Sequence, residues 1–199
     1  DVDAADVVFD GQYVRLSDER AAREQNRYLT LRDFANLCVK NIAGGDALTS
    51  HASACLPVSP PPFMAGIAEV EVDKATGKVT VVDYAAAVDC GTVINEALAR
   101  VQAEGGIAQG IGHALYEIVE HDERGRLRTG NFMSYKLPTR LDIGSIRVAF
   151  EPSYEPTGPF GAKSIGEVVI NTPLAAVASA VAHATGHQVR SLPITPEKA

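Results

Sequence analysis

The chain has 199 residues, of which 46% are apolar and 22% charged, a balance typical of a soluble globular protein with one sizeable domain or two small ones. The formal net charge of −7 argues against a nucleic-acid partner, because phosphate contacts need clustered lysine and arginine. No apolar run reaches the roughly 18 residues that span a bilayer, so we expect neither a transmembrane helix nor a membrane partner.

Residues 1–62 predict an N-terminal region made of a hairpin, a helix and a linker. The stretch "DVVFDGQYVRL" alternates around Asp10-Gly11, as a hairpin with a tight turn does. The charged segment "SDERAAREQNR" is expected to be a solvated connection. Thr30 is expected to cap a helix over 31–43 that ends at two glycines, and three consecutive prolines predict an extended linker over 58–63.

Residues 63–199 predict a larger C-terminal lobe. Alternating residues flank the turn "KATG", which predicts a long antiparallel hairpin with one covered face. Residues 95–119 predict a helix that is broken or bent at Gly105-Gly106, because two interior glycines cost about 2 kcal/mol relative to alanine.

Beyond this helix the pattern is less regular. Residues 117–131 predict a hairpin that turns near Arg124-Gly125, 134–144 an irregular connection, and 145–153 a strand.

The last part of the chain predicts a helix and a short strand. Thr172 is expected to cap the helix, Pro173 to begin it and Gly186 to end it, before a strand at 188–194. Strands and helices alternate without a regular βαβ order. We therefore predict an α+β fold of antiparallel hairpins with interspersed helices, as one domain or two closely joined lobes.

Cysteine usage predicts the compartment. Cys38, Cys55 and Cys90 stand far apart and form no CxxC pair, so neither a disulfide framework nor a zinc or iron–sulfur site is expected. This pattern suits a reducing cytoplasm. The chain begins at Asp1 without an initiator methionine or a signal-peptide pattern, which indicates a piece of a longer protein.

The stretch "GPFGAKSIGE" (158–167) places Glu167 behind three glycines and Lys163. One interpretation is a connecting loop with an incidental acid, which is the commoner case for loops. The other is a buried carboxylate that acts as a general base beside an anionic cofactor, with the glycines letting the ligand approach the backbone. Spacing alone leaves both open.

Two glutamines and several glycines lie on the helix at 95–119. Gln102 and Gln109 are seven residues apart and share one helix face, with Gly105, Gly106 and Gly110 on and between their turns. Close helix packing is the commoner cause of such glycines. The alternative is a cofactor that lies against the helix and is held by the amide side chains. The pattern is not GxGxxG in a βαβ unit, so a Rossmann nucleotide site is not supported.

Three stretches together resemble the molybdenum hydroxylases of the xanthine dehydrogenase and aldehyde oxidase type. They are "AAVDCGTVIN" (86–95), "QAEGGIAQGIGHALYE" (102–117) and "GPFGAKSIGE" (158–167). "SYKLPT" and the closing "LPITPEK" are similar to the same family, and the stretches follow its order. The resemblance implies the C-terminal part of the large, molybdenum-cofactor-binding subunit.

The resemblance also implies roles for individual residues. Glu167 matches the family's active-site glutamate, which takes a proton from a molybdenum-bound hydroxide before the oxygen attacks an electron-poor carbon. The molybdenum is held by the dithiolene of the pterin, so no protein metal ligand is expected. The residues expected to contact the cofactor are Gln102, Gly105, Gly106, Gln109, Ala162, Lys163, Ser164 and Gly166.

The cofactor implied is molybdopterin with molybdenum, often in a cytosine dinucleotide form in bacterial members. The partners implied are the upstream part of the same large subunit, iron–sulfur and FAD domains or subunits, and a small-molecule substrate. Electrons would leave through these redox partners towards NAD or another acceptor. The chain is not expected to turn over alone.

The substrate class is a hypothesis, and the sequence differs from the family pattern at two places. "SYEPTGPFGAKSIGEVVINTP" (153–173) is most similar to the xanthine dehydrogenase branch, which favours a purine. Alternatives are an aldehyde oxidoreductase, a carbon monoxide dehydrogenase or a non-catalytic assembly domain, although an intact "GAKSIGE" argues against degeneration. Glu96 stands where the family usually has proline, and Arg100-Val101 where a Glu-Gly pair is common.

Overall fold

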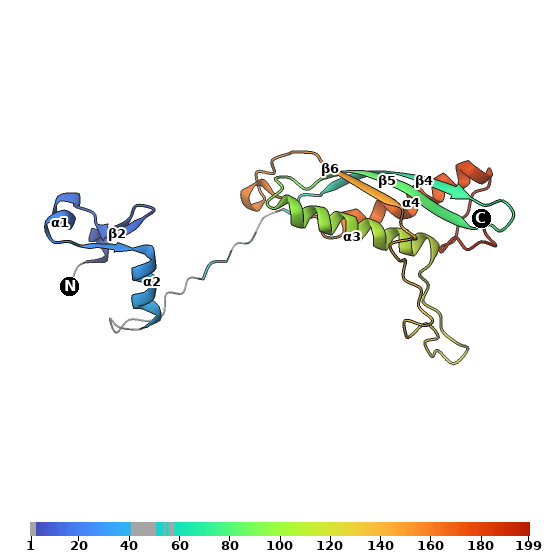
Figure 1. Cartoon of the computed structure of the whole chain (residues 1–199), viewed down its shortest axis with the longest axis horizontal. Coiled ribbons are helices and arrows are strands. Elements are labelled where there is room, and N and C mark those ends of the chain that lie inside the picture. Colours follow the sequence, from blue (N-terminus) through green and yellow to red (C-terminus); the bar gives the residue numbers. More distant parts are fainter. Residues whose placement is uncertain (1–2, 41–50, 54, 56–57) are drawn as a thin grey trace. The chain divides into compact units, whose positions relative to one another are not determined.

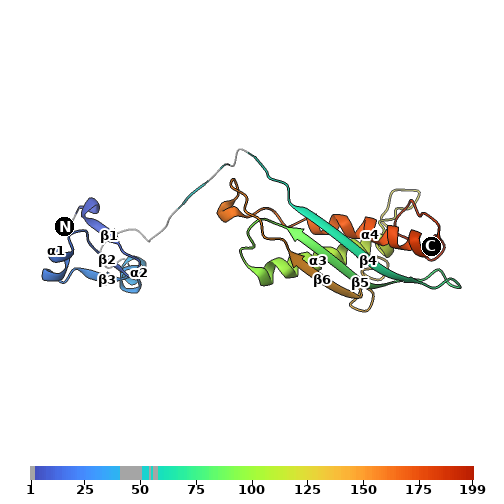
Figure 2. The ribbon, with the colours of Figure 1, turned by 90° about the horizontal axis from the view of Figure 1, so that it is seen from above.

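The computed structural model describes residues 3–40, 51–53, 55 and 58–199, and all structural statements refer to these. The chain divides into two compact units, Asp1–Cys55 and Leu56–Ala199. The regular structure of the described residues consists of helices and two three-stranded, mostly antiparallel sheets (Figure 1, Figure 2). The predicted α+β fold class is confirmed.

The first unit contains a small antiparallel sheet. Its strands are β1 (Val7–Phe9), β2 (Tyr13–Leu16) and β3 (Tyr28–Thr30), and a short 3₁₀ turn, η1 (Ala4–Asp6), precedes them. The predicted hairpin is confirmed. Asp10 closes its turn by accepting the amides of Gln12 at 3.0 Å and Tyr13 at 2.8 Å, while Gly11 adopts a φ of +96°.

The segment expected to be a solvated connection is partly helical. Helix α1 (Glu19–Glu24) begins after Asp18, whose carboxylate accepts the amides of Arg20 and Ala21. Two side-chain ion pairs, Arg20–Glu24 and Arg23–Glu19, join successive turns and add to its stability. The charges that indicated exposure therefore also stabilise a short exposed helix.

Helix α2 (Leu31–Val39) begins where predicted. The Thr30 hydroxyl accepts the Asp33 amide at 3.1 Å, which satisfies one free donor of the first turn. Phe34, Leu37 and Cys38 are half-buried. The expected continuation to residue 43 and the two glycines that follow it lie outside the described residues.

The second unit is built on a longer sheet. Strands β4 (Phe63–Val72) and β5 (Val79–Asp89) form the predicted antiparallel hairpin. The prolines before β4 adopt no regular structure. The third strand, β6 (Ser145–Phe150), pairs parallel to β5, because the chain returns through a helix and an irregular arm before it re-enters the sheet.

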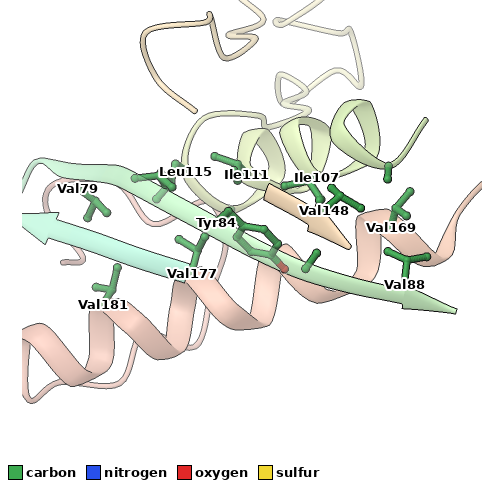
Figure 3. Packing of buried hydrophobic residues seen from close by; sticks show 14 of the residues in the cluster. Val79, Tyr84, Val88, Ile107, Ile111, Leu115, Val148, Val169, Val177 and Val181 are labelled. Carbon is green, nitrogen blue, oxygen red and sulfur yellow. The ribbon is translucent and has the colours of Figure 1, made fainter. Parts of the chain in front are cut away.

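Helices α3 (Glu96–Leu115) and α4 (Val168–Thr185) cover one face of this sheet. Tyr84 of β5 is fully buried between them, and its hydroxyl lies 3.0 Å from that of Thr172 (Figure 3). The fully buried aliphatic side chains around it come from both helices and from the sheet: Val88, Ile107, Ile111, Val169, Val177 and Val181.

Two expectations about these helices are wrong. Helix α3 is continuous, so Gly105-Gly106 does not break it. Helix α4 begins at Val168, which places Pro173 inside it, and Thr172 bonds Tyr84 instead of capping. Val169 is buried against Gly106, and this packing stabilises the turns before the proline despite the hydrogen bond that a proline removes.

Helix α4 is the one described helix that is long and apolar enough to cross a membrane by length and composition, with a mean hydropathy of 1.4 over its 18 residues. One face of the helix, formed by Val169, Pro173, Val177 and Val181, is nevertheless buried in the core of this unit.

The remaining segments are mostly irregular. Residues 117–131 form a hairpin-like turn with one isolated bridge, His121–Leu127, in an arm that leaves the body of the unit (Figure 1). The connection over 134–144 contains no regular helix or strand, as predicted. The strand expected at 188–194 is absent, and instead the buried Ile194 donates its amide to the Ala114 carbonyl at 2.7 Å.

The adjacent glycines of α3 give a matched test of packing. Alanine at Gly106 would place its Cβ 2.3 Å from a Val169 methyl, and overpacking of this kind lowers the free energy of unfolding by about 1–3 kcal/mol. Alanine at Gly105 would meet nothing within 4 Å, and helix propensity raises the free energy of unfolding by about 1 kcal/mol. Thermal unfolding of Gly106→Ala and Gly105→Ala should move in opposite directions. Equal shifts would contradict this packing.

Candidate cofactor-binding site

The loop that carries Glu167 runs from the end of β6 to the start of α4 and is attached to the end of β5. The Lys163 amide donates to the Cys90 carbonyl at 2.7 Å, and the Thr92 amide donates to the Gly161 carbonyl at 2.8 Å. An isolated bridge joins Gly91 to Ala162. The fold therefore brings together 86–95 and 158–167, two of the three stretches that carry the family resemblance.

Glycine is required where these two segments meet. Gly91 has a φ of +68°, and a Cβ there would lie 2.3 Å from the Gly161 carbonyl oxygen. Gly161 has a φ of +82°, and its Cβ would lie 2.4 Å from the Tyr154 ring. Gly91 allows the two backbones to approach closely, and Gly161 leaves room for the Tyr154 ring. Both have a positive φ that other residues rarely adopt.

The third stretch joins the same place through Gln102. Its side-chain amide nitrogen donates to the Gly166 carbonyl at 2.9 Å, which links α3 to the peptide before Glu167. Gln102, Gly105 and Gln109 are all exposed on α3. The structure thus places Gln102 beside the loop and leaves Gln102, Gly105 and Gln109 accessible on α3.

The glycines of α3 have two different roles. Gly106 is buried against Val169, and Gly110 is buried against Pro173, so helix packing accounts for their missing side chains. Gly105 and Gly166 are exposed, and a Cβ on either would meet no atom within 4 Å. The open glycines, with the glutamine amides, are the residues that fit a large polar ligand at the backbone.

Glu167 lies directly before α4 and is its N-cap residue. Its side chain makes no capping hydrogen bond within the described part of the chain. The carboxylate is exposed in this structure, where the second interpretation expected a buried one. An exposed carboxylate beside a helix N-terminus is electrostatically favoured and is accessible to a bound molecule.

Lys163, which the resemblance implies as a cofactor contact, forms an ion pair within the chain. Its ammonium lies 2.5 Å from Oδ2 of Asp89, and its side chain is only 8% exposed. It also lies over the Phe63 ring, 5.1 Å from the centroid. The neighbouring Ala162 is half-buried and Ser164 exposed, so backbone or hydroxyl contacts from these two remain accessible.

Asp89 is the residue of this site that the sequence did not identify. Its second oxygen accepts the Ser153 hydroxyl at 2.6 Å and the Gly91 amide at 3.0 Å. The hydrogen bond from Lys163, followed by those from Ser153 and Gly91, lowers the pKa of Asp89 to about 2. Asp89 and Lys163 are 74 residues apart, so only the fold brings them together.

The lowered pKa makes a prediction for acid stability. A shift from 3.8 to about 2 means that Asp89 stabilises the fold by about 2 kcal/mol above about pH 4, and that this contribution is lost as pH falls towards about 2. Asp89→Asn should unfold more easily than wild type at neutral pH, with the difference shrinking in acid. Urea unfolding measures this. A difference independent of pH would contradict the assignment.

Comparison with known proteins identifies the kind of domain. The sequence profile described as "Molybdopterin cofactor-binding domain" matches residues 1–144. The xanthine dehydrogenase molybdenum-binding subunit of Escherichia coli is 34% identical over 177 residues, 88% of this chain and 24% of that protein. The chain therefore contains a molybdopterin cofactor-binding domain. The chain belongs to the molybdenum hydroxylase family, as part of its large subunit.

Other relatives extend this assignment. The aldehyde oxidoreductase of Megalodesulfovibrio gigas is 37% identical over 140 residues, 68% of this chain and 15% of that protein. The crystal structure of quinoline 2-oxidoreductase from Pseudomonas putida matches 99% of this chain and 25% of its own, with a TM-score of 0.70 and 30% identity. The chain spans about a quarter or less of the length of these relatives.

Proposed function

We propose that this chain contributes the catalytic base and part of the cofactor cradle to a molybdenum hydroxylase that acts on a purine or a related N-heterocycle. Glu167 is the general base. The observation that carries the proposal is that the Glu167 side chain makes no capping hydrogen bond in the described residues. Glu167 follows Gly166, which has free space around it and whose carbonyl accepts a hydrogen bond from Gln102 of α3.

The bound molybdenum cofactor would supply the oxygen atom, derived from water, and would take up the electron pair of the oxidation. Glu167 would accept the proton released from that oxygen, a role that suits a carboxylate because it takes one proton at a fixed position. The N-terminus of α4 favours the ionised form before proton transfer.

Cofactor binding would be shared between the helix and the loop. Gln102, Gly105 and Gln109 present amides and an open backbone on α3, and Ala162, Ser164 and Gly166 present theirs on the loop. We propose a cytosine dinucleotide form of molybdopterin, with iron–sulfur and FAD groups on partner domains or subunits, in a cytoplasmic complex that contains the upstream part of the large subunit.

The purine preference rests on the similarity of residues 153–173 to the xanthine dehydrogenase branch. Identity to the aldehyde oxidoreductase, 37%, is as high as identity to the xanthine dehydrogenase subunit, 34%, so aldehyde oxidation is the second candidate. Carbon monoxide oxidation and a non-catalytic assembly role are further alternatives.

The test uses the full-length large subunit co-expressed with its partner subunits. Molybdenum and pterin analysis is expected to give stoichiometric cofactor, and an activity panel a higher kcat/KM for hypoxanthine or xanthine than for aromatic aldehydes. The opposite order would make the protein an aldehyde oxidoreductase. Cofactor without activity on any substrate, or no cofactor at all, would support the assembly role.

A further inference from the structure

The loop that carries Glu167 is tied down four residues earlier, at Lys163. The Lys163 ammonium and the Asp89 carboxylate lie 2.5 Å apart, with exposed side-chain fractions of 8% and 22%. Surface ion pairs contribute little, but removing one partner of a largely buried pair leaves the other charge uncompensated. This pair therefore constrains the loop strongly.

Both members of the pair are themselves fixed. Ser153 and Gly91 bind the second oxygen of Asp89, and the Lys163 backbone is bonded to Cys90. Asp89 stands at the last position of β5, so the attachment point belongs to the central strand of the sheet. The loop is thus anchored to a strand that is paired on both sides.

A second tie lies closer to Glu167, where the Gln102 side-chain amide of α3 donates to the Gly166 carbonyl at 2.9 Å. Only three residues separate Lys163 from Glu167, and one of them is the conformationally permissive Gly166. Without these two ties, Gly166 would let the Glu167 backbone adopt several orientations. A general base must instead lie within hydrogen-bond reach of the proton that it takes.

We propose that Asp89 and Lys163 are positioning residues, which orient Glu167 through a β5-anchored ion pair without touching cofactor or substrate. This inference rests on the proposed function of Glu167. It gives the Lys163 side chain a role other than the cofactor contact that the resemblance implies, because the lysine charge is already compensated by Asp89. Losing either partner should then have the same consequence.

The experiment compares Asp89→Asn and Lys163→Met in the holoenzyme complex. Each is expected to lower kcat about 10- to 100-fold, as misplacement of a catalytic group does, with KM and molybdopterin content near wild type. The double variant should fall no further than the worse single one, because the two residues act as a unit. Hydrogen exchange in 158–167 should become faster in all three.

Two conservative variants and a control variant at a second ion pair complete the experiment. Asp89→Glu and Lys163→Arg keep the charges and fold more readily, and each should recover part of the lost kcat. Arg147 and Asp83 form another cross-strand ion pair on the same sheet, with Arg147 largely exposed. Arg147→Met is expected to change neither kcat nor exchange in the loop.

Three results would overturn the inference. Loss of molybdopterin in Lys163→Met with normal content in Asp89→Asn would make Lys163 a cofactor ligand. Unchanged loop exchange in both variants would remove the positioning role, and so would an unchanged kcat. An active Glu167→Gln enzyme would instead refute the proposed base, whatever the exchange data show, so the two failures are distinguishable.

Discussion

Glu167→Gln is expected to reduce kcat by about 10²- to 10⁴-fold, the range that general acid–base catalysis contributes, while molybdenum and molybdopterin remain bound. Glutamine has nearly the same size and keeps an acceptor oxygen, but it cannot take a proton. The side chain is exposed and makes no capping bond in the described residues, so the substitution removes no contact that holds the fold. The loss should therefore be chemical.

Steady-state kinetics and metal analysis on the full complex measure this effect. Glu151→Gln, at an exposed glutamate just after β6, is the matched control and should keep wild-type kcat. A Glu167→Gln enzyme within about twofold of wild type would contradict the base assignment, since that difference is less than 1 kcal/mol of barrier. Loss of molybdenum from this variant would indicate a role in cofactor retention instead.

Local patterns predicted the elements whose structure depends on local interactions. The β4–β5 hairpin follows from alternation on either side of "KATG", and the Thr30 cap follows from a hydroxyl placed three residues before Asp33. Helix α1 was not predicted because its sequence signals are local but weak. They are a single aspartate cap and two charge pairs within six residues.

The errors in α3 and α4 have one physical cause. Glycine and proline were weighed by their local cost, yet the contact between the two helices outweighs it. Gly106 is buried against Val169, which favours a continuous α3 and an α4 that begins before Pro173. Tertiary packing of this kind cannot be derived from one segment, because each partner is unfavourable when its segment is considered alone.

For the site, the family resemblance pointed to Glu167 and Gln102, whereas the contacts between distant segments became known only from the fold. The ion pair between Asp89 and Lys163 joins residues from two matched stretches whose adjacency depends on the parallel pairing of β6 with β5. The distinction between Gly105 and Gly106 likewise depends on where α4 lies. Neither could be derived from spacing, since both depend on contacts between distant segments.

Gly105→Leu is expected to lower the molybdopterin content of the purified complex at least tenfold, about 1.4 kcal/mol or more of binding free energy, without unfolding the domain. The position is exposed, and a Cβ there meets nothing within 4 Å, so the helix accepts the larger residue and gains propensity. The same open space lies on the glutamine-bearing face of α3, where the cofactor is proposed to lie, and a leucine side chain would fill it.

Cofactor content is measured as molybdenum and released pterin per subunit, alongside thermal unfolding. Ser179→Leu introduces the same side chain at an exposed position of α4 beside Ile67 and should leave both quantities unchanged. A Gly105→Leu protein that keeps full cofactor would mean that the ligand does not approach this part of α3. A variant that loses both cofactor and stability would mean that Gly105 is needed for packing, which would contradict the free space around it.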